Sequence, residues 1–347
     1  MLHRTKASRR RLLLGSTAAG LAVLGVAQVA AGRASVALPG SSPSAVVEAL
    51  ASHTPSVSGD GRLVAYAGVP SGADTRTSTI FLKDRADGSV VELTPVPADV
   101  QTGDSVWPVL SADGCSVTFI TQIPFDLFRD DDRGGRWDVY RQNLPQCGGV
   151  LGDIELVSTT RGSGFGTAAD DVVPTDPPAV SADGTIVVYT HQFSVAAPEL
   201  TGVILVDLAV AIGDDGRAYP VAGTPIGSPD TAFVHRGLRQ PSISNDGTVV
   251  AFTSDADSSA PEPVWGSGLV RGGPATTHVY AWDRSDPDRA TSVRRISSTG
   301  GADTGDAHSP SVSGDGRFVA FVSTASNLVP GATLPVCNPG CVPQVYL

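Results

Sequence analysis

The segment Pro310-Ser311-Val312-Ser313-Gly314-Asp315-Gly316-Arg317-Phe318-Val319-Ala320-Phe321 is the strongest indication of the fold, because four earlier copies of it occur in the chain. The other copies begin at Pro55, Pro108, Pro178 and Pro241. All five follow the pattern Pro-x-(Val/Leu/Ile)-Ser-x-Asp-Gly-x-x-Val-x-(Phe/Tyr). The chain is therefore built on an internal repeat, which is typical of solenoids and propellers.

The repeated Asp-Gly predicts a tight turn between two strands. Asp-Gly tolerates positive φ and is typical of β-hairpins. The Pro cannot donate to a strand ladder and suits the first residue of a strand. The Val-x-aromatic after the Gly favours a second strand with one bulky and one small face. Each copy predicts a β-hairpin whose Asp has a structural role.

Further strands follow each hairpin. A third strand is expected at residues 79–82, 138–141, 203–206, 278–281 and 344–347, and a fourth at 90–93, 155–157, near 219–222 and at 293–296. Four antiparallel strands per repeat are typical of a propeller blade. We therefore predict an all-β fold, a β-propeller of four-stranded blades with five blades, in one domain of residues 53–347.

The fifth repeat stops at its third strand. Within residues 38–52, which otherwise form a linker, Ala45–Leu50 resembles a fourth strand. We expect this segment to complete the fifth blade and close the ring, because closure removes exposed sheet edges. A truncated chain with blades missing is the alternative.

The Ser-x-Asp-Gly turns, with their preceding Pro and following Val-x-aromatic, resemble the WD40-like β-propeller repeats of TolB and of prolyl oligopeptidases, often called PD40 repeats. The resemblance covers residues 55–347 and implies a TolB-like propeller. Residues 323–331 and the Val-Tyr third strands look similar to those of exported actinobacterial members. The repeat motif carries no catalytic residue, and no Gly-x-Ser-x-Gly elbow occurs in the chain.

Residues 1–37 are typical of a secretory signal peptide. Arg9-Arg10-Arg11 precedes the apolar run Leu12–Ala31, and Ser35-Val36-Ala37 suits cleavage after Ala37. The segment Ser8–Leu13 resembles a twin-arginine signal, so we expect an exported protein that is secreted or associated with the cell wall. An uncleaved anchor is the alternative, because the run is long enough to span a bilayer. After cleavage we expect no membrane contact.

The charge of the mature chain excludes one class of partner. The signal peptide carries six of the 24 basic residues and none of the 35 acidic ones, so cleavage leaves a net charge of −17. Lys83 is then the one remaining lysine. Nucleic acids and anionic surfaces are bound through basic patches, so we expect no nucleic-acid partner.

Four cysteines lie in the exported part, where disulfides persist. Four cysteines allow three pairings. Cys115 opens a second strand and Cys147 follows the neighbouring third strand, so antiparallel pairing brings them together. We predict the disulfides Cys115–Cys147 and Cys337–Cys341. A zinc site of four thiolates is the alternative, but the spacing does not suit it.

Long loops are expected at the blade end opposite the Asp-Gly turns, and binding residues often lie on such loops. We predict a binding face there, at the mouth of the central channel. The candidates are His53, Asp176, Arg239 and His308, each two residues before a repeat's Pro, and Trp107 and Trp137, in or beside the long loops. Ordinary surface histidines and tryptophans buried in blade packing are the structural alternatives.

Calcium is the metal that the sequence suits best, because it prefers oxygen ligands. The candidate ligands are Asp126, Asp130, Asp131 and Asp132. The spacing is not that of an EF-hand, and Arg129 and Arg133 are alternative partners for these acids, so a solvated acidic loop is the competing interpretation. We expect no other cofactor.

The function predicted from these patterns is that of an exported, non-catalytic binding or scaffold protein. Its ligand is expected to be a protein, peptide or glycan held at the loop-rich face. The alternative is a secreted hydrolase or lyase with an active site at the channel mouth that uses His53 and His308.

Overall fold

The structure is a computed structural model. It describes residues 55–70, 77–95, 103–125, 136–151, 154–158, 171–172, 176–192, 201–208, 219–222, 239–254, 276–286, 292–298, 305–325, 327–329 and 343–347. The chain divides into two compact units, Met1–Gly40 and Ser41–Leu347, and all the described residues belong to the second. The expected signal peptide and the segment Ala45–Leu50 lie outside the described residues.

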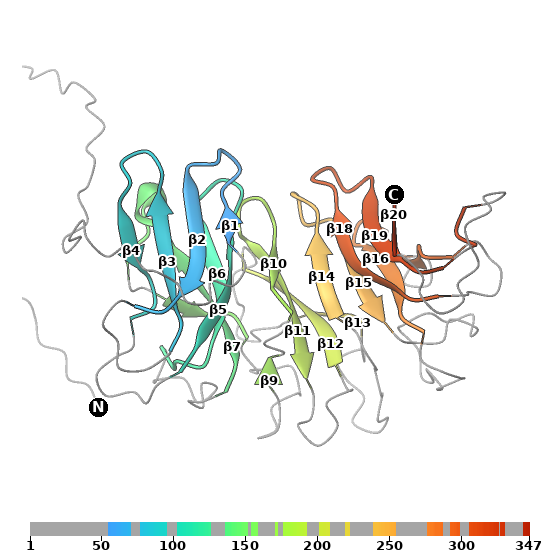
Figure 1. Ribbon diagram of the computed structural model, residues 1–347, viewed down its shortest axis with the longest axis horizontal. Helices are drawn as coiled ribbons and strands as arrows, with labels where there is room; N and C mark the ends of the chain where they lie inside the picture. The colour runs from blue at the N-terminus through green and yellow to red at the C-terminus, as the bar shows by residue number, and fades with distance from the viewer. Residues whose placement is uncertain are drawn as a thin grey trace, which may run out of the picture. The chain divides into compact units, whose positions relative to one another are not determined.

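Five antiparallel sheets make up the described part of the chain (Figure 1). In chain order, sheet 1 contains β1 (Ser56–Val57), β2 (Leu63–Gly68), β3 (Thr79–Asp84) and β4 (Val90–Glu92), and sheet 2 contains β5 (Ser105–Leu110), β6 (Ser116–Thr121), β7 (Asp138–Asn143) and β8 (Ile154–Leu156). Sheet 3 contains β9 (Asp171–Val172), β10 (Ala179–Val180), β11 (Ile186–Gln192), β12 (Thr201–Asp207) and β13 (Tyr219–Ala222). Sheet 4 contains β14 (Arg239–Ile243), β15 (Val249–Ser254), β16 (His278–Asp283) and β17 (Val293–Arg295), and sheet 5 contains β18 (Ala307–Val312), β19 (Val319–Ser323) and β20 (Gln344–Tyr346).

The predicted fold class is confirmed. Sheets 1, 2 and 4 each contain four sequential antiparallel strands, the arrangement of a propeller blade, whereas sheet 3 contains five strands and sheet 5 contains three. In sheet 3, β9 and β10 both pair with β11, so the first strand is split into two pieces. The number of blades and the closure of the ring stay predictions.

The Ser and Asp side chains of the Ser-x-Asp-Gly motif form hydrogen bonds within the turns. In sheet 4, Ser244 Oγ donates to Asp246 Oδ1 at 2.7 Å, and the same oxygen accepts the N–H of Thr248 at 3.0 Å. Ser244 Oγ also accepts the N–H of Val249 at 3.0 Å. Gly247 has φ +73°, which an L side chain rarely adopts. The same bonds recur in the other four turns, so these aspartates are structural.

Successive sheets pack face to face through alternate residues of their strands. Between sheets 3 and 4, Ile186 and Leu205 pack with Val250, Phe252 and Tyr280 in one buried cluster. The rings of Phe252 and Tyr280 are stacked with centroids 5.9 Å apart. A similar cluster joins sheets 1 and 2. The period of two thus places bulky side chains of one sheet against the smaller face of the sheet before it.

The predicted disulfide Cys115–Cys147 is confirmed. It joins the residue before β6 to the last residue of the short 3-10 helix η1 (Pro145–Cys147), across 32 residues of sequence. Cys337 and Cys341 lie outside the described residues. Among the residues that the structure describes, no helix is both long and apolar enough to cross a membrane.

Candidate functional site

The first strands of sheets 2, 4 and 5 share an irregularity where they begin. The residues directly before the repeated Pro are Trp107, Gln240 and Ser309, with φ of +53°, +54° and +53°. The strand register shifts at the same points. Positive φ is uncommon for residues other than glycine, and such strain clusters at functional sites. We call these positions, the residue before each and the equivalent Asp176 of sheet 3 the strand-start row.

Hydrogen bonds connect the strand-start row across sheets 3, 4 and 5. Asp176 Oδ2 accepts from Thr190 Oγ1 at 3.0 Å and from the N–H of Gln240 at 3.3 Å. Gln240 Oε1 accepts the N–H of Ser309 at 2.9 Å, and Ser309 Oγ lies 3.0 Å from His308 Nδ1. Asp176 is buried, with 5% of its surface exposed. The chain of bonds therefore holds polar groups of three sheets in a fixed arrangement.

Two aspartates that the sequence analysis did not predict form hydrogen bonds between neighbouring sheets at the same end. Asp104 Oδ1 accepts the N–H of Ser78 at 2.8 Å, and Asp306 Oδ1 accepts the N–H of Thr277 at 2.8 Å. Each bond links the start of a third strand to the start of the next sheet's first strand. The sequence signal that could have identified them is a Gly-Asp pair, with the Asp four residues before Pro108 and before Pro310.

The predicted site residues have different surroundings. Arg239 and His308 are partly exposed, whereas Asp176 is buried. Trp107 and Trp137 are partly buried against the cluster that joins sheets 2 and 3, so part of each side chain is used in packing between the blades. The structure connects Asp176 to His308 through Gln240 and Ser309, and it places both tryptophans in one cluster. His53 lies outside the described residues, and so does the acidic loop that includes Asp126, Asp130, Asp131 and Asp132.

His191 is a buried titratable group that the sequence patterns did not single out. It lies near the end of β11, opposite Gly202 of β12 and Val172 of β9, with 8% of its surface exposed. Burial penalises the charged ring and lowers the pKa of His191 to about 4. His191 is therefore neutral at pH 7. Its one sequence signal is its place two residues after Tyr189, at the end of the alternating strand.

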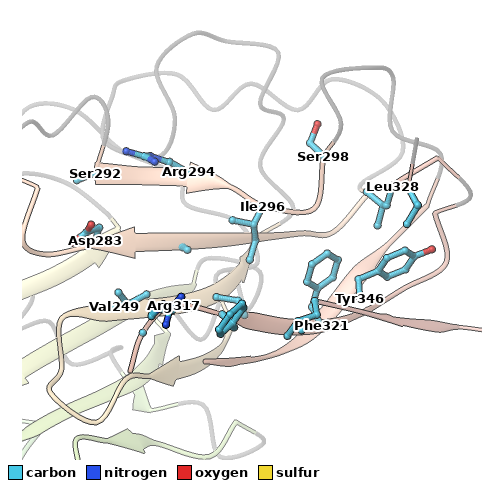
Figure 2. A pocket seen from close by; sticks show the side chains of 16 residues that line it. Val249, Asp283, Ser292, Arg294, Ile296, Ser298, Arg317, Phe321, Leu328 and Tyr346 are labelled. Atoms are coloured by element: carbon cyan, nitrogen blue, oxygen red, sulfur yellow. The ribbon is translucent and has the colours of Figure 1, made fainter. Parts of the chain in front are cut away.

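A groove of about 460 Å³ lies between sheets 4 and 5 (Figure 2). Phe321 and Tyr346 line it from sheet 5, with ring centroids 5.6 Å apart, and Ile296 lines it from sheet 4. Arg294 and Asp283 lie toward the other end. Phe321 also belongs to the small buried cluster between these sheets, with Val279 and Ala307.

Within the described ranges, no group of three or more His, Cys, Asp or Glu side chains is arranged to hold a metal ion. The calcium prediction concerned a loop outside those ranges and stays a prediction.

No protein-family model and no curated protein matches this chain. Among solved structures, TolB from Acinetobacter baumannii is 14% identical with a TM-score of 0.43, over 80% of this chain and 52% of that chain. A TolB-like protein from Agrobacterium tumefaciens is 15% identical with a TM-score of 0.43, over 79% and 70%. An oligogalacturonate lyase from Vibrio parahaemolyticus is 13% identical with a TM-score of 0.44, over 77% and 57%. This chain thus spans about half the length of the first of them, and similarities at this level do not indicate a function.

Proposed function

We propose that this chain is an exported, non-catalytic binding protein that holds a protein, peptide or glycan at the end of its sheets opposite the Asp-Gly turns. The mature protein is secreted or associated with the cell wall. The observation that carries the proposal is the difference between the two ends of the repeat.

At the turn end, all five repeats use the same Ser-x-Asp-Gly side chains in the same hydrogen bonds. Identical residues in identical contacts need no explanation beyond folding. At the strand starts, equivalent positions hold different residues: Val106, Asp176, Arg239 and His308 two residues before the Pro, and Trp107, Gln240 and Ser309 directly before it. The scaffold does not require this variety, which supports a role in recognition.

The strand-start row is also rigid enough for recognition. The buried carboxylate of Asp176 and the amide of Gln240 tie the row together, so a ligand would meet polar groups that are already oriented. A pre-organised surface loses less conformational entropy on binding than a mobile one. Within the row, Arg239 and His308 are partly exposed, so a guanidinium cation and an imidazole ring are accessible to a ligand.

The test is thermal unfolding of the purified protein with EDTA, calcium, peptides and cell-wall glycans. A ligand that binds only the folded state at 100 times its Kd stabilises it by about 2.7 kcal/mol. We expect a peptide or glycan to raise the melting temperature. The proposal fails if folded protein shows no shift with any of these ligands and captures no partner from the secreted fraction.

A matched pair of variants locates the site. Arg239→Ala removes a cation at the strand-start row, and Arg317→Ala removes one from the turn end, where the side chain is 73% exposed. We expect Arg239→Ala to weaken the ligand-induced shift and Arg317→Ala to leave it unchanged. The reverse result would place binding at the turn end.

A further inference from the structure

The groove between sheets 4 and 5 contains a small side chain where two other sheets have a leucine. Ala281 of β16 lines the groove and pairs with Ala251 of β15. At the equivalent position, Leu82 of sheet 1 and Leu205 of sheet 3 are buried in the clusters that join these sheets to the next ones. An alanine therefore leaves room beside sheet 5 that a leucine fills in sheets 1 and 3.

Apolar side chains surround this space. The rings of Phe321 and Tyr346 are stacked, with centroids 5.6 Å apart, and Ile296 lies opposite them on sheet 4 (Figure 2). The hydroxyl of Tyr346 donates to Ala325 O at 2.9 Å, so its polar end already has a partner and the ring is left for apolar contact. Such a lining suits a flat or branched apolar group.

Two arginines line the same groove, away from the stacked aromatic pair (Figure 2). The side chains of Arg294 and Arg317 are 72% and 73% exposed, so a ligand can reach both guanidinium groups. Arg294 lies 3.9 Å from Asp286 and Arg317 lies 4.0 Å from Asp315. These distances exceed that of a direct hydrogen bond, so neither carboxylate is in close bidentate contact with its arginine.

The charge of the groove is opposite to that of the chain. Among the described residues that line it, the charged ones are Arg294, Arg317 and Asp283. Asp283 Oδ1 accepts from the N–H of Ser285 at 2.9 Å and from its Oγ at 2.6 Å, so this carboxylate is held by its own turn. The whole chain has a net charge of −11, whereas the groove has two cations and one anion. The groove therefore favours an anionic ligand.

We propose that the groove between sheets 4 and 5 binds a small apolar carboxylic acid. Its apolar body packs against Phe321, Tyr346 and Ile296, and its carboxylate lies against Arg294 and Arg317. Guanidinium groups match a carboxylate in geometry as well as in charge. The volume of about 460 Å³ lies within the range of about 300–1,000 Å³ that is typical of small-molecule pockets. The groove shares no residue with the strand-start row, so this proposal does not rest on the proposed function.

A matched pair of ligands tests the role of charge. The probes are 4-phenylbutanoate and its neutral amide, 4-phenylbutanamide, which have the same apolar body. Isothermal titration calorimetry of the purified protein should show that the acid binds and that the amide binds at least about tenfold more weakly, because the amide cannot form charge-assisted hydrogen bonds with the arginines.

Three variants test the location. Ala281→Leu places in sheet 4 the side chain that sheets 1 and 3 have, and it should abolish binding while the melting temperature is retained. Arg294→Gln/Arg317→Gln should weaken binding of the acid about tenfold or more and leave binding of the amide unchanged. Arg62→Gln is the control, because Arg62 follows the turn Gly of sheet 1 as Arg317 follows that of sheet 5. It should keep the full affinity.

Several results would overturn the proposal. Equal affinities for the acid and the amide would remove the arginines from recognition, and unchanged binding by Ala281→Leu would place the ligand elsewhere. Tighter binding of a peptide that ends in phenylalanine would assign the groove to a peptide C-terminus. No binding by the folded protein is the result expected if Ala45–Leu50 fills the groove as the fourth strand of sheet 5.

Discussion

The burial of His191 makes the stability of the fold sensitive to mild acid. The folded pKa is about 4 and the ordinary value is 6.5, because the buried ring binds a proton poorly. Between these values the unfolded chain binds the proton and the folded chain does not, so acid favours unfolding. The difference between these two pKa values corresponds to about 3 kcal/mol of stability lost between pH 7 and pH 4.

The measurement is urea unfolding at pH 7, 5.5 and 4, for the unmodified protein and for His191→Gln. The substitution lowers the free energy of unfolding at every pH, but it also removes the titrating group. The stability that His191→Gln loses between pH 7 and pH 4 should therefore be about 3 kcal/mol smaller than the stability that the unmodified protein loses. His308→Gln is the control and should keep the acid loss, since it leaves His191 in place. If the unmodified protein and His191→Gln lose the same stability in acid, His191 is not the cause of the acid sensitivity.

Three further predictions concern stability. The double variant Cys115→Ser/Cys147→Ser should unfold with a free energy about 3.7 kcal/mol lower, because the disulfide closes a loop across 32 residues and restricts the unfolded chain. Hydrogen bonds from Ser244 and from the N–H of Thr248 lower the pKa of Asp246 to about 2. The stability that this carboxylate contributes is therefore present above pH 3.8 and is lost as the pH falls toward 2. The Asp246→Asn variant should lose less stability than the unmodified protein in that window, as measured by acid titration of the circular dichroism. Phe252→Ala removes a fully buried ring and should cost about 3–5 kcal/mol in urea unfolding.

Each of these predictions has a result that contradicts it. An unchanged urea midpoint in the double cysteine variant would show that the crosslink does not restrict the unfolded chain. Identical acid titrations for Asp246→Asn and the unmodified protein would remove the turn carboxylate as a cause. A cost below about 1 kcal/mol for Phe252→Ala would mean that the core between sheets 3 and 4 is not packed as described.

Most strands were predictable because their signals are local. The expected third strands 138–141 and 278–281 lie within β7 (Asp138–Asn143) and β16 (His278–Asp283). The split of the first strand of sheet 3 was not predictable, because β9 pairs with the far end of β11 and only that pairing identifies it as a strand.

The candidate site was predictable in position but not in chemistry. Counting two residues back from each Pro identified Asp176 and His308. The residues that connect them, Gln240 and Ser309, could not be predicted, because neutral polar side chains before a Pro carry no distinctive pattern. Trp107 and Trp137 were predicted as binding candidates, but both pack in part against the core.

Local sequence patterns were sufficient to predict the hairpins, their structural aspartates and the Cys115–Cys147 bridge. Positive φ at the turn Gly and alternation along a strand involve only a few neighbouring residues, so they can be recognised without the fold. Tertiary structure alone decided which sheets touch, since Gln240 meets Asp176 across 64 residues and Val312 meets Ser242 across 70. It also decided the burial of His191 and the exposure of Phe318, because burial depends on the neighbouring strands and sheets and not on the residue's own repeat.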